Sequence, residues 1–221
     1  AHGRHAGLVH GGGSARARGI YQPGNRVSVH WRARLEEHLG SYRCELVAAE
    51  AAPLMDDPGR LGALASACAL IEAGLPERAP HPALYRDTLR LVDALTGPSW
   101  GQAYVRWELA LIAELGFGLD LTACAVTGAT ERLAYVSPKT GRAVSLAAGA
   151  PWRDRLLALP RFLIRPTDTG GAGQDAEILA GLRLTGHFLE RHVFCEPHRK
   201  MPAARTRLAE RLRRALAAHA D

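Results

Sequence analysis

Arginines and aromatic residues are interspersed near the start of the chain. Residues 1–43 contain seven arginines and two glutamates, with Tyr21 and Trp31 among them. A basic groove that follows phosphates, with aromatic faces that stack on bases at about 1–3 kcal/mol each, binds single-stranded nucleic acid non-specifically. This pattern predicts a nucleic-acid-binding module. Its candidate contact residues are Arg16, Arg18, Tyr21, Arg26, Arg32 and Arg34.

The role of Trp31 has two interpretations. It alternates with two valines in a predicted strand, so it can belong to an apolar core instead of stacking on a base. Tyr21, in the turn before this strand, is the better stacking candidate. Arg32 and Arg34 fall on the face opposite Trp31, where they either contact phosphates or are simply solvated.

Two further basic clusters lie later in the chain. Lys139 and Arg142, followed by Arg153 and Arg155, could extend the nucleic-acid surface or receive an acidic protein tail. Lys139 and Arg142 are therefore further candidate DNA contacts. A solvated helix face is the commoner explanation for the last cluster. That cluster comprises Arg205, Arg207, Arg211, Arg213 and Arg214.

Four possible metal ligands gather near the end of the chain: His187, His192, Cys195 and His198. His187 and His192 are five residues apart, which is about 140° around a helix, so they do not share one helix face. Surface histidines near a helix end are the expected explanation, and a metal-dependent enzyme is a weak alternative. The chain's four cysteines include no C-x-x-C pair and are expected to be reduced thiols.

The sequence contains no recognisable catalytic constellation. It has neither a G-x-S-x-G nucleophile motif nor a G-x-x-x-x-G-K-[ST] phosphate-binding loop. Glu108 and Glu114 are six residues apart on one predicted helix and do not form an acid–base pair. We therefore expect a protein that is not an enzyme, with no catalytic residues, no bound metal and no cofactor.

The composition is that of a globular protein of one large or two small domains. Of 221 residues, 47% are hydrophobic and 23% charged. No apolar run could cross a membrane and the start resembles no signal peptide, so we expect a cytoplasmic protein without a membrane partner. Formal charge is +5 over residues 1–43, −4 over 44–150 and +5 over 151–221. Basic ends around an acidic middle indicate an anionic partner, or only the surface charge of an arginine-rich protein.

Hydrophobic periodicity divides the chain into a β region and a helical region. Alternation over residues 26–31 predicts a strand, residues 42–47 are a second candidate strand, and residues 11–18 are predicted to be a flexible basic loop. From about Ala48 the period becomes helical. Helices are predicted at residues 61–74, 81–95, 100–115, 175–194 and 203–218, with a loop at 166–174. The predicted class is α+β, with one domain at 1–47 and a mainly α-helical domain at 48–221 that includes a turn-rich insert at 117–147.

One long stretch identifies a family resemblance. Residues 107–145, WELALIAELGFGLDLTACAVTGATERLAYVSPKTGRAVS, end a helix at Gly116 and Gly118 and continue into turns. This segment resembles the central helical domain of the RecO family of bacterial recombinational repair proteins, in an alphaproteobacterial form. WRARLEEHLG at 31–40, LPERAPHPALY at 75–85 and the C-terminal helices are similar to the same family, so the resemblance covers nearly the whole chain.

The resemblance implies a fold. In that family an oligonucleotide/oligosaccharide-binding (OB) barrel precedes an α-helical domain, so residues 1–47 would be a partial OB-type barrel. The match begins late in the barrel. We therefore expect its leading strands to be missing, most simply through an incomplete gene model, because an open barrel exposes unpaired backbone. Some members bind zinc through four cysteines in the insert; Cys124 alone is present here, so the insert is expected to be metal-free.

The resemblance also implies a function. The chain would be a mediator of DNA repair and homologous recombination that binds single- and double-stranded DNA and anneals strands. With RecR it would load RecA onto DNA coated by single-strand-binding protein, whose acidic C-terminal tail would be a partner. It would act in the cytoplasm, at the nucleoid. The alternative, from another class, is a helical protein-interaction adaptor without DNA binding of its own.

Overall fold

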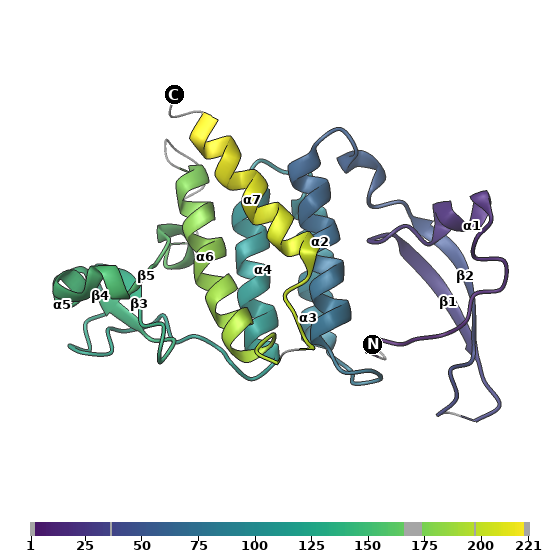
Figure 1. The fold of residues 1–221 in the computed structure, drawn as a ribbon, viewed down its shortest axis with the longest axis horizontal. Helices are drawn as coiled ribbons and strands as arrows, with labels where there is room; N and C mark the ends of the chain where they lie inside the picture. Colours follow the sequence, from purple (N-terminus) through teal and green to yellow (C-terminus); the bar gives the residue numbers. More distant parts are fainter. Residues whose placement is uncertain (1–2, 36, 166–173, 197, 219–221) are drawn as a thin grey trace.

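A computed structural model describes residues 3–35, 37–165, 174–196 and 198–218, apart from the side chain of Arg16. An N-terminal module of one helix and two strands leads into a group of packed helices, and a small sheet projects from the far side of that group (Figure 1). The chain is thus α+β, as predicted. The loop predicted at 166–174 lies, except for its last residue, outside the described residues.

The N-terminal module combines a short helix with an antiparallel strand pair. Helix α1 (Ala15–Ile20) begins after Ser14, whose hydroxyl accepts a hydrogen bond from the Ala17 N–H at 3.2 Å. The prediction of a flexible loop was wrong here, because a capping serine is followed by the helix-favouring residues alanine and arginine. Strand β1 (Arg26–Arg32) pairs with β2 (Ser41–Ala48), so both predicted strands are confirmed.

One face of this strand pair carries apolar side chains that remain largely exposed. Val29 of β1 is 48% exposed and Leu46 of β2 is 44% exposed. The other pairing made by these strands, within the residues the structure describes, is a single bridge between Leu8 and Ser41. A barrel needs a closed circuit of paired strands, and none is seen in the described part of the chain. The OB-type barrel therefore stays a prediction.

The helical domain contains the five predicted helices, with ends that differ by a few residues. The 3-10 turn η1 (Ala52–Leu54) leads into this domain. The helices are α2 (Pro58–Gly74), α3 (Pro82–Ala94), α4 (Trp100–Glu114), α6 (Gln174–His192) and α7 (Ala203–Ala218). Helix α4 packs between α3 and α6, while α7 crosses α2 (Figure 1). None of the described helices is long and apolar enough to span a bilayer.

The insert between α4 and α6 holds a second small sheet. Strand β3 (Leu133–Val136) lies between β4 (Ala143–Ser145) and β5 (Leu157–Ala158), and both neighbours run antiparallel to it. The turn that joins β3 to β4 is the predicted S-P-K-T-G turn, and Gly141 adopts φ 69° in it. The elements that link β4 to α6 are α5 (Leu146–Gly149), η2 (Ala150–Arg155) and η3 (Arg161–Leu163).

A buried network of polar side chains joins four of the helices. Arg205 of α7 donates from Nε and Nη2 to the carboxylate of Glu108 on α4, at 2.6 and 3.1 Å. Tyr104 donates to the same carboxylate at 2.8 Å and lies 2.6 Å from the hydroxyl of Ser66 on α2. Thr185 of α6 also donates to Glu108. Burial and the Glu108 charge raise the pKa of Tyr104 well above its usual value of 10, so the phenol remains a donor.

The interpretation of the last helix as a solvated arginine face was wrong for Arg205. Its side chain is 5% exposed, and Leu208, three residues later on the same helix face, is 2% exposed. Arg207 and Arg211 are exposed, as expected. Periodicity does not identify an arginine that faces inward, because its acidic partner is 97 residues away in the sequence.

Removal of the buried guanidinium should destabilise the protein strongly. We expect Arg205→Ala to lower the free energy of unfolding by about 3–5 kcal/mol, because Glu108 would be left charged and buried without its partner. Urea denaturation followed by circular dichroism measures the change. Arg207→Ala, an exposed arginine on the same helix, is the matched control and should change stability by no more than about 0.5 kcal/mol. Equal stability of the two variants would contradict the structural role of the ion pair.

Candidate nucleic-acid interface

A groove of about 640 Å³ lies on the N-terminal module. It brings together Tyr21 and Arg32, two residues that the sequence singled out, and adds His30 and Arg43, which sequence reasoning missed. The full lining is His10, Tyr21, His30, Arg32, Ser41, Tyr42, Arg43, Cys44 and Glu45. The groove therefore offers several cationic or protonatable groups, one carboxylate and aromatic rings.

Strand register explains why the basic side chains gather. His30 of β1 stands directly opposite Arg43 of β2, and Arg32 opposite Ser41. Opposed residues and residues two apart share a face, so His30, Arg32 and Arg43 share one. Neither guanidinium has an ion-pair partner among the described residues, and both side chains are available to phosphates. Arg43 could have been identified from the alternation of side chains along β2, but only with the pairing register of β1 and β2 in hand.

Tyr21 lies at the groove beside Cys44 of β2. A tyrosine is neutral at physiological pH, and desolvation and the contact with the Cys44 thiol raise the pKa of Tyr21 still further above that range. A neutral aromatic ring at a basic groove is the arrangement that stacking on an unpaired base requires.

Trp31 fits neither of the two interpretations drawn from the sequence. Its Nε1 donates to the carbonyl of Leu39 at 3.0 Å, and the ring of His5 meets it edge-on at 4.8 Å between centroids. The guanidinium of Arg78 lies over the ring at 5.6 Å. The indole is therefore half-buried in a local cluster rather than in a barrel core, and it is less open to a base than Tyr21 is.

The remaining candidate contacts whose side chains are described do not line this groove. Arg26 is 3.1 Å from Glu50, and Arg142 is 3.5 Å from Asp120, so part of their charge is already balanced. Three others are exposed: Arg18 in the last turn of α1, Arg34 in the loop after β1, and Lys139 in the turn between β3 and β4. Arg16 lies in α1, and its side chain is outside the described part of the structure.

Three of the four possible metal ligands near the end of α6 have separate partners, and the fourth, Cys195, is an exposed free thiol. His187 Nε2 donates to the carbonyl of Pro138 at 3.0 Å, and His192 stacks on Phe117. His198 lies 3.0 Å from Glu196. Across the described residues, no group of three or more His, Cys, Asp or Glu side chains is arranged to hold a metal ion.

Cys124 organises the start of the insert through hydrogen bonds. Its side chain is 1% exposed, and its Sγ accepts the N–H of Ser145 at 3.3 Å. The hydrogen bond from Thr127, supported by the one from Ser145, lowers the pKa of the Cys124 thiol to about 6. Its own N–H donates to the carbonyl of Ala129 at 2.7 Å. These hydrogen bonds therefore tie the turn at Cys124 to Ala129 and to Ser145 at the end of β4.

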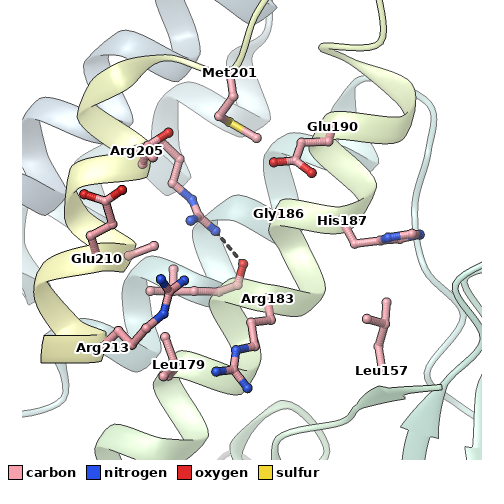
Figure 2. A pocket seen from close by; sticks show the side chains of 13 residues that line it. Leu157, Leu179, Arg183, Gly186, His187, Glu190, Met201, Arg205, Glu210 and Arg213 are labelled. Carbon is pink, nitrogen blue, oxygen red and sulfur yellow. Dashed lines mark hydrogen bonds between the residues drawn. The ribbon is translucent and has the colours of Figure 1, made fainter. Parts of the chain in front are cut away.

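A second concavity, of about 390 Å³, lies between α6 and α7 and extends to β5. Figure 2 shows Arg183 and Arg213 beside Leu179 at one end of it, and Glu190 and Met201 toward the other. Arg205 reaches in from α7 and donates to the carbonyl of Leu182 at 2.6 Å. The pocket thus combines apolar side chains with a basic end that can receive carboxylates.

Comparisons with known proteins agree with one another. Residues 55–202 match the family model described as "Recombination protein O C terminal". The chain is 59% identical over 216 residues to the "DNA repair protein RecO" of Rhodospirillum centenum, covering 97% of this chain and 85% of that protein. It is 54% identical to the protein of the same name from Rhodospirillum rubrum, covering 96% and 86%. A relative of that name from Methylobacterium nodulans is 54% identical over 87% of this chain and 79% of its own length.

Proposed function

The chain belongs to the RecO family, and from that premise we propose that it serves DNA repair and homologous recombination as a mediator without enzymatic turnover. It would bind single- and double-stranded DNA and anneal complementary strands. With RecR it would help to load RecA onto DNA coated by single-strand-binding protein. The observation that best supports the DNA-binding part is the groove where Tyr21, His30, Arg32 and Arg43 meet.

The proposed mechanism is electrostatic capture of the backbone followed by stacking. Each phosphate neutralised by an arginine releases counterions, so the affinity falls with salt, with a log–log slope of about −0.7 per contact on single strands. Arg32 and Arg43 supply two such contacts from one sheet face. Tyr21 would add stacking on an unpaired base, which favours single strands without sequence readout.

The pocket between α6 and α7 supports a second part of the proposal, which is that the chain binds the acidic tail of single-strand-binding protein. Arg183 and Arg213 give it a basic end beside Leu179, where carboxylates and an apolar side chain could bind together (Figure 2). Glu190 and Glu210 also line the pocket, so we place the carboxylates of the tail at the arginine end.

The alternative function is a protein-interaction adaptor that works through residues 48–221 and does not bind DNA. The α6–α7 pocket is compatible with it, since this pocket belongs wholly to the helical domain and its insert. A measurement of DNA affinity distinguishes the two functions, because the mediator binds DNA and the adaptor does not.

Variants of the N-terminal groove should change two different properties of DNA binding. We expect Arg32→Ala/Arg43→Ala to make the log–log salt dependence shallower by about 1.4, because two phosphate contacts are lost. Tyr21→Leu should weaken binding by about 1–3 kcal/mol without a change in that slope, because stacking involves no counterion. Fluorescence anisotropy of a labelled single-stranded oligonucleotide over a salt series measures both.

A charge-matched control removes two exposed arginines of α3. Arg86→Ala/Arg90→Ala lowers the net charge equally but lies away from the groove, so its slope should equal that of the unmodified protein. If both double variants bind alike, the groove is not the binding site. If the unmodified chain does not bind at all, the adaptor is the better account.

Loss of the basic end of the α6–α7 pocket should weaken binding of an acidic tail. We expect Arg183→Ala/Arg213→Ala to weaken the affinity for a labelled peptide, with the sequence of the acidic C-terminal tail of a bacterial single-strand-binding protein, by at least about 1.5–3 kcal/mol. Arg207→Ala/Arg211→Ala removes the same charge from the exposed side of α7 and should have little effect. Equal losses would show that only net charge matters.

A further inference from the structure

The end of helix α4 holds an aromatic residue in a defined position. Gly116 adopts φ 90°, its N–H donates to Ala113 O at 2.9 Å, and the N–H of Phe117 donates to Ile112 O at 3.0 Å. This pair of bonds is a Schellman motif, in which a glycine in the left-handed region reverses the chain after a helix. The direction in which Phe117 leaves α4 is therefore set by the glycine before it.

Phe117 is the outermost of three parallel rings. Its ring lies 4.6 Å from that of His192 with an interplanar angle of 12°, and His192 lies 6.1 Å from Phe188 at 10°. These separations are those of stacked aromatic pairs. Phe188 is 2% exposed, whereas Phe117 is 40% exposed. The stack thus runs from the core to the surface and ends in a ring that solvent reaches.

Two exposed basic residues lie on the segments that adjoin this ring. The bond from His187 to Pro138 O holds the turn between β3 and β4 against α6, and the exposed Lys139 is the next residue of that turn. The N–H of Asp120, three residues after Phe117, donates to Gly141 O of the same turn at 3.1 Å. Arg191 is exposed beside His192 in the last turn of α6. The turn between β3 and β4 and the last turn of α6, which both adjoin the Phe117 segment, therefore each carry one cation.

We propose that Phe117, supported by His192 and Phe188, is a second base-stacking platform for single-stranded DNA, with Lys139 and Arg191 as its phosphate contacts. The proposal rests on the DNA-binding function proposed above and places a contact in the helical domain, outside the N-terminal groove. An unpaired base extends the stack on the outer face of Phe117, whereas the bases inside a duplex are covered on both faces by their neighbours. Lys139, a candidate DNA contact from the sequence, would thus bind a phosphate of the same strand whose base stacks on Phe117.

The test uses single-stranded oligonucleotides that carry 2-aminopurine, a base whose fluorescence is quenched when it stacks. We expect Phe117→Leu to abolish the platform's share of the quenching and to weaken single-strand binding by about 5- to 150-fold. Leucine retains an apolar side chain after the helix end, and Phe117→Tyr should restore both readouts. Affinity for closed circular duplex DNA, which has no terminal base pair, should not change.

The matched control is Trp152→Leu, which removes an exposed aromatic residue from η2 of the insert and should leave both readouts unchanged. Equal losses of single-strand and duplex affinity in Phe117→Leu would overturn the proposal, since they would indicate a structural effect. If Phe117→Leu binds normally while Tyr21→Leu does not, the platform is refuted and the proposed function stands. If the unmodified chain binds no DNA, the proposed function fails and the platform fails with it.

Discussion

The buried ion pair between Arg205 and Glu108 is the interaction on which the arrangement of the helical domain depends. Two charges removed from water are stable only when their hydrogen-bonding groups are satisfied, and here Tyr104, Ser66 and Thr185 complete the network from three helices. This requirement fixes α7 against α4 and α6. The α6–α7 pocket follows from it, because the guanidinium of Arg205 forms part of its wall. An apolar contact at this position would allow α7 to shift along α4, whereas the two hydrogen bonds from Arg205 to Glu108 require one relative position of the helices.

The close packing of α4 against α6 determines the position of the stacked rings of Phe117, His192 and Phe188. A Cβ added at Gly101 would lie 2.6 Å from Ile178 Cδ1, and one added at Gly181 would lie 2.8 Å from Val105 Cγ1. A larger residue at either position would force the neighbouring side chain to move, so the two glycines favour this close packing of the helices. The stack of Phe117 on a ring at the end of α6 depends on this spacing, so small residues inside the core position a contact at the surface.

The alternation of basic and acidic regions along the chain overstates the charge that is free on the folded protein. The acidic middle is partly neutralised within the molecule, since Glu50 pairs with Arg26 and Glu108 with Arg205. The arginines that remain open to phosphates are thus fewer than the sequence suggests. In the insert, Cys124 accepts hydrogen bonds from neighbouring backbone and hydroxyl groups, and these bonds hold the turn in which it lies.

The sequence by itself determined the family and most of the local structure of this protein: the two strands of the N-terminal module, the five long helices and the helix end at Gly116, though not helix α1. Periodicity and glycine positions act over a few residues, which is why they could be recognised without a fold. The basic and aromatic character of the N-terminal module was also visible. Only the tertiary structure decided which side chains meet. Arg205 is buried and pairs with Glu108. Arg43 and Arg32 lie on the same face of the β1–β2 pair. Phe117 stacks on His192 at the end of α6, a helix that begins more than fifty residues after Phe117. Burial and pairing of this kind depend on residues far apart in the chain, and no local pattern encodes them.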